Sequence, residues 1–432
     1  MKMRINKAYN LLQYFLSLFV RQAAFSKEGP CILIACHDTN RYAKCNGKWF
    51  SPILEPMAEY YRRLGIKIIH LSYPPTFDSF TKVYGDSIYI NRSLFCMKII
   101  KMIELLIFGQ HVSEIRFNKR MASVYKKIIT ITSPRIILSI TTPVSMANAA
   151  HDLAIPLIEP HHGMNTKPDR DLMIEMKFGI PELDLPNIFL SFDETTQETL
   201  RSIFQGQSTR SLLMPHPWHV EALRTESKLI SNTNSQRSSN IFATGKSLFL
   251  VTLAWGYDGE LDYLCNIIPN GILHPSIERA IAMTPKNIMW LMRLHPIQLK
   301  DKAYRHHRDY VYELPKRFNN VDVDIANSLP LPLLLQRCCG HISMMSGVCG
   351  EAALMGVPSL MLCPTLKPGG VLEGCYSEFS SEVVTFGNLV AEEIAAWVVA
   401  HAENVALNKY RAVNDQKLFE NQLDKLLDGS LV

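Results

Sequence analysis

Short apolar runs that end in polar residues recur along this chain, and they constrain its fold more than any other feature. The first run, GPCILIACH at 29–37, is β-branched and wholly apolar before His37, which predicts a strand buried in a parallel sheet. A helical stretch at 50–65 follows, and the run IKIIHLSY at 66–73 predicts a second strand. Strand, helix and strand in this order are typical of an α/β fold. The same type of run recurs at 135–141, 155–163 and 187–193.

The alternation breaks at 225–246, a stretch rich in Ser, Asn and Thr that has the composition of a linker. It restarts after the linker, with helices predicted at 276–283 and 348–356. The strand-like runs of this second part lie at 247–255, 287–296, 341–347 and 357–363.

Two such series predict two domains, since 432 residues exceed the length of one typical domain. We predict an α/β protein with two doubly wound, Rossmann-like domains that face each other across a cleft. The predicted segments are an N-terminal amphipathic helix (1–28), a first domain (29–224), the linker (225–246), a second domain (247–387) and C-terminal helices (388–432).

Composition excludes several classes of protein. The chain has 47% apolar and 20% charged residues, as in an ordinary globular protein, and its formal charge of +5 does not indicate nucleic acid binding. Its ten cysteines form no CxxC pair, which argues against a zinc site and for reduced thiols in a cytoplasmic protein. No secretory signal and no apolar run of membrane-spanning length is present.

The first 25 residues allow two interpretations. Leu11, Leu12, Phe15 and Leu18 share one face of a predicted helix, and basic residues flank it. Such a helix either lies in the inner interface of the cytoplasmic membrane or packs on the first domain. Its apolar part is about half the length that a spanning helix requires.

The stretch WLMRLHP at 290–296 places two functional side chains at the end of a predicted strand. Arg293 and His295 follow an apolar run, and Pro296 ends the strand because it lacks a backbone donor. Open α/β folds bind ligands at this carboxyl edge of the sheet. The guanidinium and the imidazole are therefore candidates for binding an anionic group.

The stretch at 341–362 predicts a strand, a turn at Ser346 and Gly347, and a helix. The start of a helix favours an anion, and Ser346 adds a hydroxyl donor. Glu351 is placed to accept from the hydroxyls of a ribose or sugar. Alternatively, Ser346-Gly347 is an ordinary turn and Glu351 only complements the helix dipole. Together with Arg293 and His295, these residues predict a site for a nucleotide-sugar donor.

Further candidates end other strands. Asp258 and Glu260 lie among glycines at 253–263, where a carboxylate orients an acceptor or acts as a base, or forms only a turn. In the first domain, His37 and Asp38 follow one strand, and His161 and His162 follow another. The spacing of these histidines does not match a metal-binding motif, so we predict no metal.

The order of these motifs resembles the C-terminal half of GT-B-fold glycosyltransferases that make bacterial capsule, lipopolysaccharide and other surface glycans. The resemblance covers about 247–365 and includes sialyl- and Kdo-transferase-like enzymes and the alditol-phosphate polymerases of teichoic acid synthesis. It implies that His295 and Ser346 bind the donor phosphate or cytidylate. Met345-Ser346-Gly347 stands where sialyltransferase-like members carry paired serines, which leaves a UDP-sugar donor open. HHG at 161–163 resembles an acceptor-side element of the polymerases and implies that His162 is the base, with Asp38 as second choice and His37 beside it.

The expected function is transfer of a sugar from a nucleotide-sugar donor to a hydroxyl of a glycan or lipid-linked glycan, at the inner face of the cytoplasmic membrane. The nucleotide-sugar is a substrate, and the resemblance implies no metal and no other cofactor. Three alternatives stay open. They are a CDP-alditol-dependent alditol-phosphate transferase, a nucleotide-sugar 2-epimerase that needs no acceptor, and a non-catalytic scaffold with a GT-B-like fold.

Overall fold

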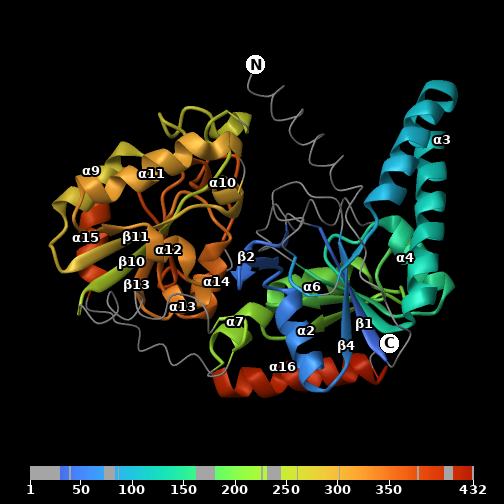
Figure 1. Cartoon of the computed structure of the whole chain (residues 1–432). Coiled ribbons are helices and arrows are strands. Elements are labelled where there is room, and N and C mark those ends of the chain that lie inside the picture. The colour runs from blue at the N-terminus through green and yellow to red at the C-terminus, as the bar shows by residue number, and fades with distance from the viewer. Residues whose placement is uncertain are drawn as a thin grey trace. The chain divides into compact units, whose positions relative to one another are not determined.

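The structure, a computed structural model, contains two compact units (Figure 1). The first consists of the described residues up to 161, those at 181–221, and those from 413 onward; the second consists of the described residues between 222 and 412. The predicted helix at 1–28 and the predicted site residues Asp38, His162 and Glu260 lie outside the described residues. The described residues are 30–37, 40–72, 83–85, 87–161, 181–224, 227–230, 245–259, 261–300, 302–376, 379–402 and 412–430.

The first unit is built on a parallel sheet whose earliest strand lies near its centre. The chain adds strands on one side of this strand and then continues on the other, which is the doubly wound order. Across the sheet the strands are β5 (Ser87–Tyr89), β4 (Lys67–Ser72), β1 (Cys31–Cys36), β6 (Pro134–Ser139), β7 (Leu157–Pro160), β8 (Ile188–Ser191) and β9 (Arg210–Leu213).

Helices cover both faces of this sheet, because alternate residues of its strands point to opposite sides. Ile32 and Ile34 of β1 belong to one apolar cluster, and Leu33 and Ala35 belong to another. A separate antiparallel hairpin consists of β2 (Ala43–Cys45) and β3 (Lys48–Phe50). The helices are α2 (Leu54–Arg63), α3 (Asn91–Thr132), α4 (Val144–Asp152), α6 (Glu194–Ile203), α7 (Pro217–Ala222) and α16 (Ala412–Leu427).

The C-terminal helix α16 belongs to the first unit. Phe419 and Leu423 are buried in the cluster that contains Ile32. Tyr60 of α2 donates to the Asp424 carboxylate at 2.6 Å, and Tyr61 donates to the Leu423 carbonyl at 2.9 Å. The chain therefore returns to its first unit after completing the second.

The second unit repeats the same architecture with six parallel strands. Across its sheet they are β12 (Val321–Asp322), β11 (Ile288–Arg293), β10 (Ser247–Thr252), β13 (Cys338–Ser343), β14 (Ser359–Met361) and β15 (Val384–Phe386).

The helices of the second unit pack against apolar clusters on the two faces of its sheet. This arrangement confirms the predicted class, an α/β protein with two doubly wound, Rossmann-like domains. The helices are α9 (Pro275–Met283), α10 (Pro296–Lys300), α11 (Arg305–Arg317), α12 (Asp324–Ser328), α13 (Leu331–Leu335), α14 (Val348–Leu354) and α15 (Ala391–His401).

Within the part of the chain that the structure describes, no helix combines the length and the apolarity needed to cross a bilayer.

Candidate functional site

The candidate site lies at the carboxyl edge of the second sheet, where the strand order reverses. Thr252, the last residue of β10, pairs with Arg293 of β11 on one side and with Ser343 of β13 on the other. The loops that leave these three strands therefore start in one row. Ligands of open α/β folds bind at such a point, in the crevice beyond the carboxyl ends of the strands.

Arg293 holds the end of β11 to a neighbouring helix. Its Nη1 donates to the carbonyls of Ala326 and Leu329, at 2.5 and 2.9 Å, and these carbonyls lie at the C-terminal end of α12. A cation at this end also complements the helix dipole. Asn327 completes the attachment, since its side chain accepts from the Leu294 backbone and donates to the Met292 carbonyl. Arg293 thus fixes the position of the segment that carries His295.

His295 is the N-cap of α10, and its hydrogen bonds define its protonation. Its Nδ1 accepts from the Ile297 backbone at 3.3 Å, while the Gln298 side chain accepts from the His295 backbone at 2.8 Å. This reciprocal pair is a capping box with Pro296 in the first turn. Because Nδ1 accepts, the proton of the neutral ring is on Nε2. Burial lowers the pKa of His295 to about 4, so the ring is neutral at pH 7 and offers an Nε2–H donor.

Trp255 lies beside His295 at the same edge. The two ring centroids are 6.1 Å apart, and 37% of the Trp255 surface is exposed. The loop that carries Trp255 is tied to the His295 segment, because Gln298 Nε2 donates to the Ala254 carbonyl at 3.3 Å. A partly exposed indole beside a neutral imidazole offers a stacking surface and a donor to one ligand.

Ser346 and Gly347 form the turn before α14, as predicted from the sequence. The Ser346 hydroxyl accepts from the Val348 backbone at 3.2 Å, which leaves its own proton to donate. Glu351 lies in the first turn of α14 and is half-buried. Burial lowers the pKa of His341, a fully buried residue of β13, to about 3. The charge of Glu351 acts in the opposite direction and is outweighed.

Asp258, a further candidate, faces a buried histidine of α11. Its carboxylate lies 3.5 Å from Nε2 of His307, and with His306 the three side chains have the proximity of a metal-binding group. However, His307 Nδ1 faces the Gln298 amide nitrogen at 3.0 Å, and that nitrogen only donates. The His307 proton is therefore on Nε2, where it occupies the lone pair that a metal would need. The geometry favours a polar pair between Asp258 and His307.

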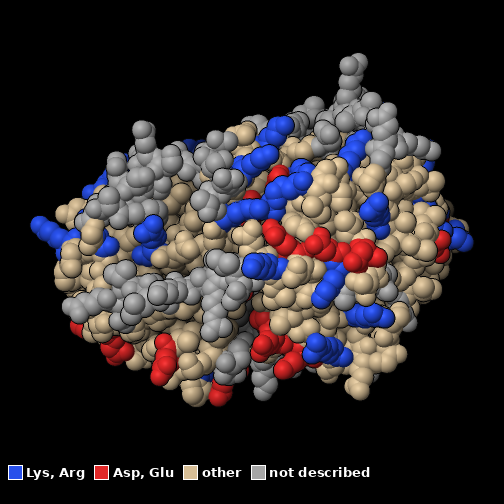
Figure 2. All heavy atoms as spheres, turned by 90° about the horizontal axis from the view of Figure 1, so that it is seen from below, with Lys and Arg blue, Asp and Glu red and all other residues tan. Residues whose placement is uncertain are grey.

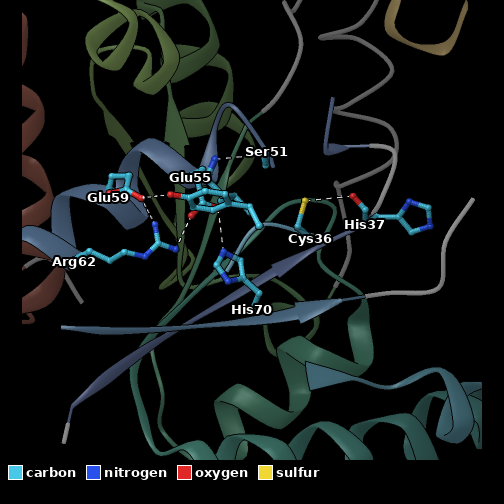
Figure 3. A network of polar contacts seen from close by, with 9 residues as sticks. Cys36, His37, Ser51, Glu55, Glu59, Arg62 and His70 are labelled. Carbon is cyan, nitrogen blue, oxygen red and sulfur yellow. Dashed lines mark hydrogen bonds and ion pairs between the residues drawn. The ribbon is translucent and has the colours of Figure 1, made fainter. Parts of the chain in front are cut away.

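The first-unit candidates within the described residues are His37 and His161. His37 is half-buried, and Figure 3 shows that its ring points away from the neighbouring polar network. The backbone of His161 donates to the Leu190 carbonyl at 2.7 Å, which extends the pairing of β7 with β8. Among the hydrogen bonds described, none joins His37 to His161 or gives the two residues a common partner.

A buried ionic network occupies the space between α2 and β4 (Figure 3). Glu55 Oε2 accepts from His70 Nε2 at 3.0 Å, and Glu55 Oε1 accepts from Arg62 Nη2 at 2.6 Å. Arg62 also pairs with Glu59, which accepts from the Tyr84 hydroxyl at 3.2 Å. Burial opposes ionisation of Glu55, but the charges and hydrogen bonds of His70 and Arg62 outweigh it and hold the pKa of Glu55 below its ordinary value. The network therefore contains an ionised carboxylate in the interior.

Sequence reasoning missed Gln298, Asn327 and the ionic network. Gln298 follows His295 by three residues, so the capping-box spacing was available in the sequence as HPIQ. Asn327 and His70 gave no such indication, because their partners lie 35 and 15 residues away along the chain.

Comparisons with known proteins identify the fold. No protein-family model and no curated protein sequence matches the chain. Among solved structures, the chain is similar to UDP-GlcNAc 2-epimerase from Neisseria meningitidis bound to UDP-GlcNAc, with a TM-score of 0.55 and 15% identity over 91% of this chain and 99% of that one. It is also similar to UDP-GlcNAc 2-epimerase from Methanocaldococcus jannaschii, with a TM-score of 0.54 and 13% identity over 92% and 99%. A third similar structure is S. aureus MnaA with UDP, with a TM-score of 0.53 and 9% identity over 93% and 97%. At these identities the likeness establishes the GT-B-like fold that the sequence resemblance implies, and it does not extend to the glycosyltransferase families named with that resemblance.

Proposed function

We propose that this protein is an enzyme that acts on a nucleotide-sugar and binds the nucleotide at the carboxyl edge of the second sheet. The observation that carries the proposal is the pairing of the neutral, Nε2-protonated His295 with the partly exposed Trp255 at the point where the strand order reverses. The imidazole donates to a phosphate, and the indole stacks on the base or the sugar. Ser346 adds a hydroxyl donor from the neighbouring strand end.

We propose glycosyl transfer as the reaction, because the order of the HP and Ser-Gly motifs resembles that of GT-B glycosyltransferases. In this proposal His295, Ser346, Gly347 and Glu351 hold the donor, and Arg293 positions the segment that carries His295. His37, Asp38, His161 and His162 of the first part of the chain are the candidates for removing the acceptor proton. Asp258 and Glu260 are candidates for orienting the acceptor. A glycan or lipid-linked glycan at the cytoplasmic membrane face is the acceptor we propose.

A second candidate reaction is 2-epimerisation of a UDP-sugar. The observation that favours it is the match in fold, over 97 to 99% of their length, to structures described as UDP-GlcNAc 2-epimerase or as MnaA with UDP. An epimerase converts its substrate alone, whereas a transferase needs an acceptor hydroxyl. Incubating the protein with UDP-GlcNAc in the absence of any acceptor therefore separates the two. The 2-epimer among the products would establish the epimerase and contradict the transferase.

The nucleotide site has a direct test in a ligand-binding series with a matched pair of variants. We expect UDP to raise the melting temperature more than CMP or CDP does; stronger stabilisation by CDP would favour the alditol-phosphate transferase. Replacing His295 by Asn keeps a good N-cap acceptor but removes the Nε2–H donor. A hydrogen bond to a charged group contributes about 1.5–3 kcal/mol, so the affinity for UDP should fall roughly 10- to 100-fold by calorimetry, with little change in melting temperature.

His274 supplies the control. It is also followed by Pro, and its Nδ1 accepts from the Ser276 backbone at 3.1 Å as the N-cap of α9. Ser276 donates to the Leu389 carbonyl, just after the edge strand β15, whereas the ring of His295 lies beside Trp255, after the central strand β10. His274→Asn should leave the affinity for UDP unchanged. Equal losses in the two variants, or no nucleotide binding at all, would contradict the proposed site.

A further inference from the structure

The helix α3 is an antiparallel hairpin of two helices. Gly109 interrupts it with φ 79° and ψ 174°, values that turn the chain back on itself. Ion pairs then link the arms: Lys101 pairs with Glu114, and both Arg116 and Arg120 pair with Glu104. Figure 1 shows both arms extending together away from the sheet of the first unit.

The tip of this hairpin is apolar and open to solvent. Leu106 is 87% exposed, the largest value among the large apolar side chains described, and Met102 and Ile107 are 67% and 65% exposed. Exposed apolar side chains gathered in this way mark a surface that another body covers. The exposed apolar residues of the tip are Met102, Ile103, Leu105, Leu106, Ile107, Phe108, Val112 and Ile115.

The hairpin also concentrates positive charge. Its 42 residues contain eight Lys or Arg and two Glu, whereas the rest of the chain has 37 basic and 38 acidic residues. Both Glu side chains, Glu104 and Glu114, already pair with cations of the hairpin itself. On the face drawn in Figure 2, by contrast, basic and acidic side chains are interspersed. The hairpin thus accounts for the net positive charge of the whole protein.

Basic and apolar side chains also line a pocket at the base of the hairpin. Its cavity volume is about 570 Å³, and it opens between the two arms and the edge strand β5. Met97 and Ile131 contribute apolar surface, and Arg120 and Lys127 contribute cations. Apolar and basic side chains therefore occur together both at the tip of the hairpin and at its base.

We propose that the α3 hairpin docks on an anionic membrane surface, with its apolar tip in the interfacial layer and its cations among the lipid phosphates. A short apolar segment flanked by Lys and Arg gains from both burial and headgroup attraction at such a surface. A second copy of this chain is the less favourable occupant, because a two-fold contact places each hairpin against its own like-charged counterpart. The proposal assigns membrane contact to described residues and does not depend on the first 28.

Sedimentation with vesicles tests the proposal on the full chain. We expect binding to vesicles that contain phosphatidylcholine and phosphatidylglycerol, and at least tenfold weaker binding to phosphatidylcholine alone, because each cation near an anionic surface contributes to attachment. The double variant Leu106→Glu, Ile107→Glu should weaken binding to the anionic vesicles at least tenfold, since two apolar side chains leave the interface. Leu183→Glu is the matched control, because Leu183 is 63% exposed on the same unit but lies outside the hairpin, and it should bind as the natural protein does.

Folding controls and the remaining outcomes decide between the occupants of the tip. Circular dichroism and the melting temperature should be the same for all three proteins, since the substituted side chains are exposed. Full binding by the double variant would overturn the proposal and assign the contact to another segment. Absence of binding by the natural protein would overturn it as well. A dimer in light scattering that the double variant converts to a monomer, without vesicle binding, would show that a second copy covers the tip.

Discussion

Acidification from pH 6.5 to pH 4 is expected to unfold the second unit, because three of its histidines are held neutral by burial. The pKa of His341 is lowered to about 3, and those of His295 and His307 to about 4. His341 uses both ring nitrogens, facing the Thr252 hydroxyl at 2.7 Å and the Ser359 hydroxyl at 3.0 Å. A second proton would make the ring a buried cation. It would also turn the ring nitrogen that accepts a hydrogen bond from a hydroxyl into a donor.

Stability falls on acidification because the unfolded chain binds more protons than the folded chain does. Between the folded pKa values and the unfolded value of about 6.5, the unfolded chain binds more protons, so stability rises with pH in this window. The stabilisation is complete above about pH 6.5 and is lost as the pH falls toward 4. Each histidine contributes up to about 1.4 kcal/mol per pH unit, so three contribute roughly 2–4 kcal/mol per unit. A typical domain has only about 5–15 kcal/mol of stability, so the loss is sufficient for unfolding.

Urea unfolding at pH 7, 6 and 5 measures this effect through tryptophan fluorescence, since Trp290 is fully buried in the second unit. The slope of the unfolding free energy against pH gives the number of protons taken up. His307→Asn should reduce that number by one. A free energy that stays constant from pH 7 to pH 5 would show that these histidines are not held neutral by the fold.

The central strands of both sheets were predictable from the sequence, for a physical reason. A central parallel strand is buried on both faces, so its residues are apolar without interruption, as in 31–36 and 288–292. Three of the four edge strands, β5, β12 and β15, contain two or three residues each, and no comparable run marks them. Their existence depends on pairing with strands that the sequence places far away.

The sequence indicates which types of residue form the candidate site, but not where those residues lie in the fold. The chain contains HP dipeptides at His216, His274 and His295, and their sequences do not say which lies where the strand order reverses. The structure distinguishes the last two by their neighbours: Ser276, two residues after His274, donates to the Leu389 carbonyl beyond β15, and the His295 ring lies beside Trp255 after β10. Likewise, a run such as Leu105 to Phe108 has the composition of a buried core, and only the tertiary structure leaves it exposed.

Replacing Arg62 by Met is expected to destabilise the first unit by about 3–5 kcal/mol, the usual loss when one partner of a buried ion pair is removed. The substitution leaves Glu55, whose side chain is 3% exposed, as an ionised carboxylate that retains only His70 among the two partners described for it. Arg63→Met is the matched control on the same helix. Arg63 lies 3.7 Å from Glu420 with 35% of its side chain exposed, so its loss should cost no more than about 0.5–1 kcal/mol.

The pH dependence of the difference between the Arg62 variant and the natural protein identifies the cause. Without Arg62, the folded-state pKa of Glu55 should rise above its ordinary value, so the variant binds an additional proton in the folded state as the pH falls. Its stability deficit should therefore be largest at pH 7.5 and smaller at pH 5, while the three histidines of the second unit titrate alike in both proteins and cancel. Adding Glu55→Gln to the variant should recover part of the loss by removing the uncompensated charge. Equal deficits in the Arg62 and Arg63 variants, or a deficit that does not change with pH, would mean that packing of the Arg62 side chain, and not its charge, stabilises this part of the molecule.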